Sequence, residues 1–322
     1  MSLHEEARMP SVITLTLNPA IDLSTSVDRV EPARKLRCGP GRRDPGGGGI
    51  NVARVAGRLG CAATAIYPVG GEVGAMLRRL VDAEGLVSAT FPIAGETRED
   101  VTVLDEASGE QYRFVLPGPP LAADEWGACL AALGMLGPGC TYVCASGSLP
   151  PGVPVDAYAQ VACLVAGWGA RFVLDTSGPA LKAALQAPTH LIKPNLRELR
   201  ELTGAPLEDQ TSMIRACRDL ITGGHVALVA LSLGANGALL VSGDEAWRAP
   251  ALAIRPASTI GAGDSFLGAM VSALAAGRPL PEAFRWAVAG GSAALLAPGA
   301  QLCLAADVRR LADAVTIEAV SG

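Results

Sequence analysis

One short segment of the chain combines residue types that suit phosphate chemistry. Residues 258–277 read STIGAGDSFLGAMVSALAAG, so Gly261, Ala262 and Gly263 precede the acid Asp264. Apolar residues then recur at helical spacing, which places the glycine-rich turn at the start of a helix. Unpaired backbone N–H groups and the helix dipole make such a start suitable for a phosphate oxygen. The same residues are also compatible with a simple helix cap, so other parts of the sequence are needed to distinguish a cap from a phosphate-binding turn.

The acid in this turn predicts a second role. Phosphoryl transfer requires charge stabilisation and positioning more than covalent chemistry from the protein. The N–H groups of residues 261–263 can hold the transferred phosphate, and Asp264 can accept the proton of an attacking hydroxyl. The turn therefore predicts a base beside an anion-binding site.

Other familiar sites do not fit the sequence. The lysines are Lys35, Lys182 and Lys193, and none follows a glycine, which excludes a Walker A loop. The segments GGGGIN and GAGDSF do not match the dinucleotide fingerprint GxGxxG. The eight cysteines form no CxxC pair, so we expect neither a zinc site nor a disulfide framework, but free thiols in a reducing cytoplasm.

The overall composition limits the partners of the chain. It has 322 residues, a net charge of −5 and 4% aromatic residues, which argues against a nucleic-acid partner. Two uncharged runs, 226–243 and 286–306, approach the length of a bilayer span. Glycine interrupts both runs, with asparagine in the first and proline in the second, so we predict no membrane segment.

The elements that must position the turn follow an α/β pattern. Apolar runs such as SVITLTL, ATAIYPVG and RFVLDTSG alternate with helical segments, which is typical of βαβ units and a mostly parallel sheet. We expect helices over residues 50–59, 73–84, 123–136, 154–168, 196–203, 209–223, 264–276 and 281–296. Residues 99–118 alternate with period two around a turn, and with residues 21–38 they predict a small β lobe.

Four motifs in order along the chain resemble those of the ribokinase/PfkB carbohydrate kinases. They are TLTLNPAID, GGGGINVAR, KPNLREL and STIGAGDSF, and the resemblance spans nearly the whole chain. It implies a ribokinase-like, doubly wound, mostly parallel α/β domain over residues 11–322. The β lobe, residues 21–38 and 99–118, would be its β-sheet lid, and residues 1–10 an N-terminal extension.

The resemblance also implies an activity. It is that of a cytoplasmic phosphotransferase with an alcohol acceptor, which uses ATP and Mg²⁺ and forms a homodimer through the lid. The segments KLRC, EASGEQYRFV and SGSLPPGV are similar to those of members that phosphorylate fructose 6-phosphate at O1, giving fructose 1,6-bisphosphate in glycolysis. Members acting on fructose 1-phosphate or tagatose 6-phosphate commonly carry lysine where this chain has Gly48. Those acceptors remain alternatives, as does a non-catalytic sugar-phosphate sensor.

The resemblance assigns roles residue by residue. Asp264 is the expected base, and Gly261, Ala262 and Gly263 form the anion hole. The expected sugar-phosphate ligands are Asp22, Lys35, Gly47, Gly48, Asn51, Arg98 and Ser148. The expected ATP ligands are Lys193, Asn195, Ser232, Gly234, Gly237 and Ser292. Glu198 is expected near Mg²⁺ through water, and potassium is expected on the backbone oxygens of Ser258, Ile260, Ala294, Ala297 and Gly299.

Overall fold

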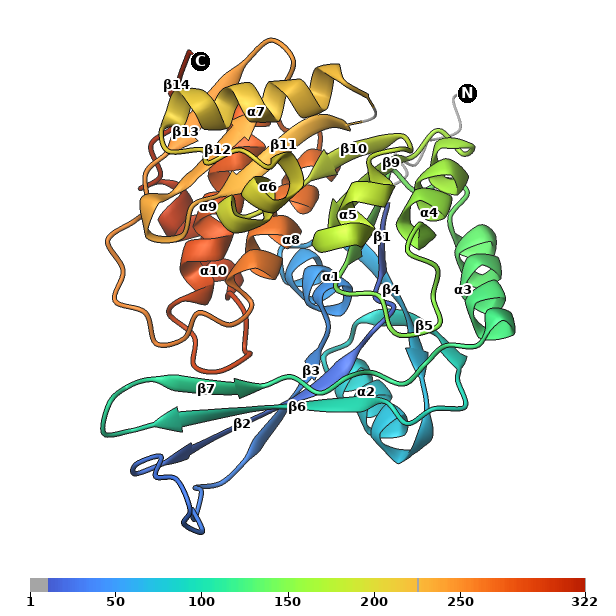
Figure 1. Cartoon of the computed structure of the whole chain (residues 1–322), viewed down its shortest axis with the longest axis vertical. Coiled ribbons are helices and arrows are strands. Elements are labelled where there is room, and N and C mark those ends of the chain that lie inside the picture. Colours follow the sequence, from blue (N-terminus) through green and yellow to red (C-terminus); the bar gives the residue numbers. More distant parts are fainter. Residues whose placement is uncertain (1–10, 225, 322) are drawn as a thin grey trace, which may run out of the picture.

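The computed structural model describes residues 11–224 and 226–321, and the predicted N-terminal extension, residues 1–10, lies outside them. An α/β body holds a ten-stranded sheet, and a four-stranded sheet projects from it (Figure 1). The strand order in the body is β14-β13-β12-β11-β10-β9-β8-β1-β4-β5. Pairing is parallel from β11 to β5 and antiparallel from β11 to β14, which confirms the predicted mostly parallel sheet.

Among the described residues, seven strands of the body follow the apolar runs of the sequence, and the other three, β5, β13 and β14, lie outside the predicted runs. The strands are β1 (Ser11–Leu15), β4 (Ala62–Val69), β5 (Val87–Pro92), β8 (Tyr142–Ser146), β9 (Arg171–Asp175), β10 (Thr189–Ile192), β11 (Val226–Ser232), β12 (Ala238–Val241), β13 (Ala246–Ala249) and β14 (Glu318–Ala319). Successive side chains pack on opposite faces, so Tyr142 and Cys144 join one core cluster while Val143 and Ala145 join the other.

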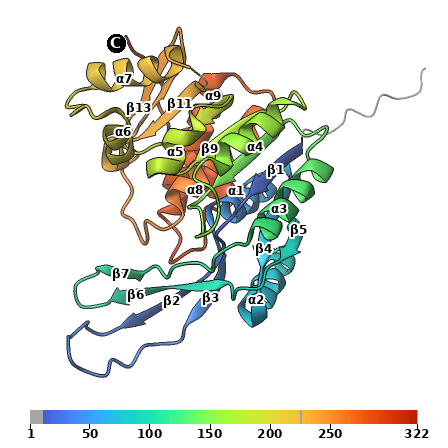
Figure 2. The same ribbon diagram turned by 45° about the vertical axis from the view of Figure 1, so that its right-hand side comes forward.

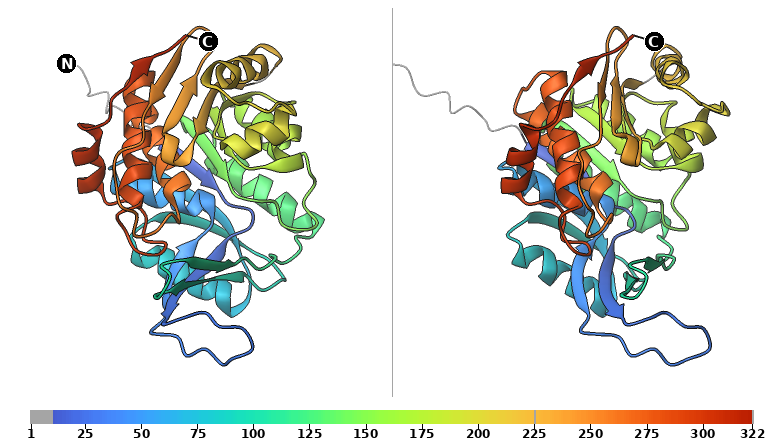
Figure 3. Two further views of the ribbon diagram at one scale, coloured as in Figure 1. Left: turned by 60° about the vertical axis from the view of Figure 1, so that its left-hand side comes forward. Right: turned by 90° about the vertical axis from the view of Figure 1, so that its left-hand side faces the viewer.

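Helices cover both faces of this sheet (Figure 3, left). One face packs against α1 (Gly48–Arg58), α2 (Gly71–Ala83), α8 (Ala262–Ala275), α9 (Leu280–Ala294) and α10 (Ala305–Ala312). The other packs against α3 (Ala123–Leu136), α4 (Ala157–Ala166), α5 (Gly178–Ala184), α6 (Leu196–Thr203) and α7 (Gln210–Thr222). The eight predicted helices are all present, whereas α5 and α10 were missed because they are too short for a clear period.

The path of the chain through the sheet creates a place for a ligand. From β1 the chain adds β4 and β5 on one side, and it then crosses to β8 on the other side and continues outward to β11. The strand order therefore reverses between β1 and β8. Open α/β sheets bind ligands beyond the carboxyl ends of the strands at such a reversal. No helix among the described residues is long and apolar enough to cross a membrane.

The small sheet has the order β3-β2-β6-β7 and projects below the body (Figure 2). Its strands are β2 (Ala20–Val27), β3 (Arg42–Gly46), β6 (Arg98–Asp105) and β7 (Gln111–Phe114). The predicted hairpin is formed by β6 and β7. In the first β-leaning segment, strand structure ends at Val27, and residues 28–41 form a loop that extends away from the body (Figure 3). Two prolines, Pro32 and Pro40, withhold backbone donors there.

Candidate active site

The turn before α8 has the geometry of an anion-binding helix start. Gly261 is the N-cap residue and has a φ of 72°, a left-handed conformation that favours glycine. A side chain at this position would also collide with Leu302, which packs directly against the turn. The first N–H groups of the helix have no partner within it, and Asp264 lies in its first turn. An anion acceptor and a carboxylate therefore occupy the same turn.

Asp264 is partly buried and has one fixed hydrogen-bond donor. The side-chain amide of Asn51 donates to its Oδ2 at 2.9 Å. Burial and the nearby Asp175 carboxylate raise the pKa of Asp264 to about 6, although the Asn51 hydrogen bond and the charge of Lys193 act in the opposite direction. A carboxyl group with a pKa near neutrality remains ionised at pH 7 and can still accept a proton in a reaction.

Lys193 provides a buried positive charge beside this turn. Its ammonium lies 3.2 Å from Asp175 Oδ1, and it would be 3.4 Å from a Cβ atom placed on Gly263. Burial lowers the pKa of Lys193, but the charge and hydrogen bond of Asp175 outweigh that effect and raise it. The ammonium is therefore retained where a phosphate on residues 261–263 would develop charge.

The glycine run before α1 allows the backbone to approach two polar side chains closely. A Cβ atom on Gly46 would lie 2.7 Å from the Asp22 carboxylate, and one on Gly48 would collide with Ser146 Oγ. Gly47 has a φ of 110°, a backbone conformation that residues other than glycine rarely adopt. A lysine in place of Gly48 would therefore need a different arrangement at the end of β8.

Asp22 lies in a row of carboxylates on the small sheet. The strand register places Asp44 and Asp100 directly opposite it on β3 and β6, so all three share one face. Burial and the charge of Asp100 raise the pKa of Asp22 to about 6, against the opposing charges of Arg113 and Arg98.

Arg98, expected at the sugar phosphate, is engaged within the chain. Its guanidinium donates to Asp100 Oδ1 at 3.1 Å, to the Leu116 carbonyl at 2.9 Å and to the Asn18 carbonyl at 3.2 Å. Its Nε is buried without a partner among the described residues. Ser148, also expected there, accepts a hydrogen bond from the Asn18 side chain at 3.0 Å. The ends of β1 and β8 thus meet β6 at the point where the strand order reverses.

Lys35 is the predicted substrate ligand that stands apart. It is exposed on the loop of residues 28–41, and that loop extends away from the body (Figure 3). In a single chain the Lys35 ammonium is therefore exposed to solvent.

On the expected nucleotide side, Asn195 and Glu198 form a reciprocal helix cap. The Glu198 carboxylate accepts from the Asn195 N–H at 2.9 Å, and Asn195 Oδ1 accepts from the Glu198 N–H at 2.9 Å. The Asn-x-x-Glu motif therefore shapes the start of α6. Asn195 also bridges to Ser232, and the turn after Ser232 carries Gly234 and Gly237, both with positive φ.

The two segments expected to bind potassium lie next to each other. The N–H of Ala257 donates to the Leu295 carbonyl at 2.7 Å, which ties the segment containing Ser258 and Ile260 to the end of α9. Ser292 and Ala294 lie in the last turns of that helix. The second lone pair of a carbonyl such as Ala294, which accepts one bond from Ala297, is still available to a cation.

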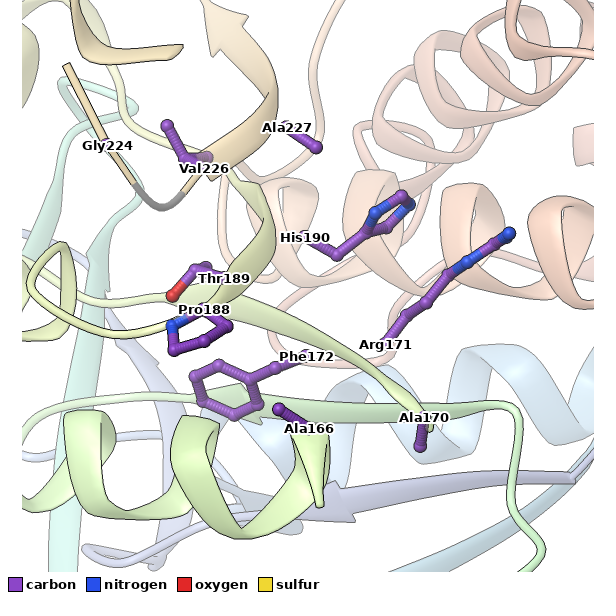
Figure 4. Close-up of a pocket in the computed structure, with 10 residues that line it drawn as sticks. All are labelled: Ala166, Ala170, Arg171, Phe172, Pro188, Thr189, His190, Gly224, Val226 and Ala227. Carbon is purple, nitrogen blue, oxygen red and sulfur yellow. The ribbon is translucent and has the colours of Figure 1, made fainter. Parts of the chain in front are cut away.

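A separate hollow of about 390 Å³ lies at the opposite, amino-terminal ends of β9, β10 and β11 (Figure 4). Arg171 and His190 are among its lining residues, and burial together with the Arg171 charge lowers the pKa of His190 to about 4. The lining that the structure describes includes no carboxylate. We assign it no role, because the predicted site residues lie elsewhere.

Three groups that act on the predicted site were not predicted from the sequence. Asp175 ends β9 in the segment LDTSG, whose polar residues follow an apolar run, yet only its contact with Lys193 identifies it. Arg113 on β7 shares the face of Asp22 through the strand register and lowers the pKa values of both Asp22 and Asp264. Arg54 donates to Asn51 Oδ1 at 3.0 Å, a contact without any signal in the sequence.

Comparison with known proteins gives a consistent result. The sequence profile described as "pfkB family carbohydrate kinase" matches residues 12–307. The ATP-dependent 6-phosphofructokinase isozyme 2 of Mycobacterium tuberculosis is 42% identical over 94% of this chain and 88% of its own length. The 1-phosphofructokinase of Rhodobacter capsulatus is 37% identical over 95% of this chain and 97% of its own.

Solved structures of phosphofructokinase-2 from Escherichia coli cover 95% of this chain and 99% of their own. The complex with potassium has a TM-score of 0.91 at 39% identity, and the complex with fructose-6-phosphate has a TM-score of 0.89 at 38% identity. A tetrameric inhibited form of the same protein also has a TM-score of 0.89.

Proposed function

The chain belongs to the pfkB family of carbohydrate kinases, and we propose that it transfers the γ-phosphoryl group of ATP to O1 of fructose 6-phosphate. One observation carries the proposal. Asp264, whose pKa is raised to about 6, lies in the first turn of α8 beside an anion-binding turn that the Lys193 ammonium also faces. A base and a phosphate site are thereby held within one turn of helix.

The proposed step uses these groups in fixed roles. Asp264 takes the proton of the O1 hydroxyl as O1 forms a bond to the γ-phosphorus, while the bond from that phosphorus to the β-γ bridging oxygen breaks. The N–H groups of Gly261, Ala262 and Gly263, with Lys193, stabilise the charge on the phosphoryl oxygens. The products are ADP and fructose 1,6-bisphosphate, and the proton is held on the Asp264 carboxyl.

The sugar is proposed to lie between α1 and the small sheet. Asp22, Gly47, Gly48 and Asn51 would bind its hydroxyl groups, and Arg98, Lys35 and Ser148 its phosphate. The close approach of Gly46 and Gly48 to polar side chains supports a narrow polar pocket there. Arg98 would exchange its bond to Asp100 for bonds to the sugar phosphate, which carries more negative charge than a carboxylate and offers more acceptor oxygens.

The nucleotide is proposed to lie over the ends of β10 and β11 and over α9. Lys193, Asn195, Ser232, Gly234, Gly237 and Ser292 would bind it. Mg²⁺ would supply charge neutralisation to the phosphates, with Glu198 contacting it through water, and the cap bond of Glu198 uses only its Oε2. Potassium would bind backbone oxygens of Ser258, Ile260, Ala294, Ala297 and Gly299, and the Ala257–Leu295 hydrogen bond supports this by joining the two segments.

A second acceptor is favoured by one observation. The similarity to the Rhodobacter capsulatus 1-phosphofructokinase makes fructose 1-phosphate, or the related tagatose 6-phosphate, the main alternative. Gly48 argues for fructose 6-phosphate, because the lysine common in those kinases would collide with Ser146 as it is placed here.

The acceptor is tested by ADP release from ATP across a panel of free and phosphorylated sugars. We expect kcat/KM for fructose 6-phosphate to exceed that for fructose 1-phosphate and tagatose 6-phosphate. A higher value for either competitor would overturn the acceptor, but not the kinase. Thermal stabilisation by a sugar phosphate without any ADP release would instead indicate a non-catalytic sensor.

The small sheet is proposed to act as a lid that pairs two chains. The register puts Tyr112 and Phe114 on the face opposite Asp22, together with Leu23, Val101 and Val103. Phe114 is 56% exposed, and Val115 and Leu116 beside it are 60% and 48% exposed. An exposed apolar sheet face of this kind favours a partner, and a second copy would also bring the loop with Lys35 to another molecule. A cytoplasmic location and a place in glycolysis remain predictions.

A further inference from the structure

Glu84 occupies an unusual position at the end of α2. It is the C-cap residue, where the helix dipole disfavours a carboxylate. Two arginines one turn apart on α1 account for its placement. Arg54 binds it in a bidentate manner, with Nε–Oε2 at 3.0 Å and Nη2–Oε1 at 2.6 Å, and Arg58 Nη2 lies 3.1 Å from Oε2. Burial raises the pKa of Glu84, but Arg54 and Arg58 outweigh this effect and lower it.

The Arg54 contact leads to the proposed base. The Arg54 side chain is 1% exposed, and its Nη1 donates to the Pro45 carbonyl and to Asn51 Oδ1, each at 3.0 Å. Because Asn51 Oδ1 is held by this donor, the amide nitrogen of Asn51 is the group that faces Asp264. If the amide rotated by half a turn, an oxygen would face the carboxylate and the hydrogen bond would be lost.

The Arg58 contact leads to the anion-binding turn. Arg58 Nη1 donates to the Gln301 carbonyl at 2.6 Å and to the Cys303 carbonyl at 3.1 Å. These carbonyls flank Leu302, a buried residue with a φ of 62° whose side chain packs against Gly261. A non-glycine residue adopts this conformation only when its surroundings hold it there.

We propose that Glu84 is a positioning residue that holds the base and the anion-binding turn in register, through Arg54 and Asn51 on one side and through Arg58 and Leu302 on the other. This inference rests on the proposed function of Asp264. It adds that residues remote from the substrate fix the positions of both the base and the anion-binding turn. A bidentate arginine pair suits this role because it restrains orientation as well as distance.

Two variants separate the two contacts. Arg54→Lys keeps the charge but cannot bind Glu84 in a bidentate manner and hold Asn51 at once. It should raise the pKa of Asp264 by roughly half a unit to one unit, because the Asn51 bond that lowers this pKa is weakened. Arg58→Ala should leave that pKa unchanged and reduce kcat by about tenfold through a displaced turn.

The pKa of Asp264 is measured by carbon-13 NMR on aspartate-labelled protein, with its signal assigned by loss in Asp264→Asn. This readout does not depend on turnover. If wild type phosphorylates no sugar, the proposed function fails, yet the titration still decides the present inference. Arg278→Lys is the matched control, because it weakens the exposed Arg278–Glu282 pair and should change neither the titration nor kcat.

Two results would overturn the inference. One is an Asp264 titration in Arg54→Lys that matches wild type, and the other is an equal shift in Arg58→Ala, which would indicate general loosening. If Arg54→Lys does not fold, Glu84→Gln replaces it, since it keeps the side-chain volume and one acceptor oxygen. Glu84→Gln should raise the pKa of Asp264 and lower kcat. If the pKa and kcat of this variant both match wild type, the proposal is refuted.

Discussion

The start of α8 and the small sheet each hold a partly buried carboxyl group whose pKa is raised to about 6, Asp264 in the first and Asp22 in the second. Burial is the main cause in both. Their neighbours differ. Asp264 receives a hydrogen bond from Asn51 inside the body, whereas Asp22 faces Asp100 and two arginines on a sheet that projects from it.

The two carboxylates therefore differ in how their surroundings set their pKa values. Around Asp264 most of the groups that shift its pKa belong to the body, namely Asn51 on α1, Asp175 at the end of β9 and Lys193 after β10, and only the Arg113 charge comes from the small sheet. Around Asp22 the charges are held by one another, and Arg98 is paired with Asp100. A sugar phosphate that binds Arg98 would break that pair and change the field at Asp22. By this proposal the body mainly sets the pKa of the base, whereas the small sheet would respond to the bound substrate.

The largest expected effect comes from removing the base. Asp264→Asn keeps the size of the side chain and an acceptor for the Asn51 amide, but it cannot take the O1 proton. We expect kcat to fall by about 10²- to 10⁴-fold while ATP binding, measured by calorimetry, stays near the wild-type value. An unchanged kcat would show that the base lies elsewhere.

The same variant has an opposite effect on stability, which separates lost chemistry from misfolding. A carboxyl whose folded pKa is raised binds protons more readily in the folded state, so its contribution is lost as pH rises through that pKa. Asp264→Asn should therefore unfold at a higher temperature than wild type at pH 7, and the difference should disappear toward pH 4. Lower stability at pH 7 would mean that the substitution damages the turn.

A smaller effect is expected at Arg98. Arg98→Ala removes a charged donor from the proposed phosphate pocket, and we expect KM for fructose 6-phosphate to rise by about 10- to 100-fold. The KM for ATP should not change. Arg43→Ala is the matched control, because Arg43 lies on the opposite face of the same sheet, paired with Glu99. Equal changes in both variants would remove Arg98 from the pocket.

The outer face of the small sheet gives the next effect. Phe114→Glu places a charge in the exposed apolar face, and we expect the dissociation constant of the proposed dimer, measured by analytical ultracentrifugation, to rise at least tenfold. Met135→Glu is the control, because Met135 on α3 is 78% exposed on the body. Dimers that persist unchanged in Phe114→Glu would place the contact elsewhere.

The two regions also differ in how far their structure could be predicted from sequence. The turn before α8 is local: two glycines, an acid and a helical period lie within one short segment, and the structure has a helix starting there. The parallel sheet was predicted for the same reason, since each apolar run indicates its own strand. Local patterns therefore specify most elements of the body, although strands β5, β13 and β14 and helices α5 and α10 were not predicted.

Contacts between distant segments left no such signal. The strand Arg42–Gly46 was missed because Pro45 and three charged residues do not resemble a strand, and its place depends on pairing with β2. Glu84 and Arg54 are thirty residues apart, and either alone is indistinguishable from a solvated surface charge. The small sheet consists mostly of such pairings, so its residues could be assigned only by resemblance.

The smallest expected effect is a change in the pH dependence of kcat/KM, and it tests the contrast between Asp264 and Asp22 most directly. If both carboxylates must be ionised in the free enzyme, kcat/KM for fructose 6-phosphate falls below about pH 6 with a slope of two protons. Asp100→Asn removes one of the two carboxylate charges that add to burial in raising the pKa of Asp22, and it keeps an oxygen for Arg98. The pKa of Asp22 should fall by less than about one unit, so the slope near pH 6 should approach one.

The kcat profile should not move measurably in Asp100→Asn, because Asp100 is not among the main groups that shift the pKa of Asp264 and the Asp22–Asp264 charge interaction ranks only fourth among the causes at Asp22. Glu99→Gln removes the same charge from the neighbouring residue on the other face, and it should leave both profiles unchanged. If Asp100→Asn instead shifted the kcat profile, the two carboxylates would titrate as one coupled pair. The substrate would then meet a single proton-sharing site, and the contrast between a preset body and a responsive sheet would no longer hold.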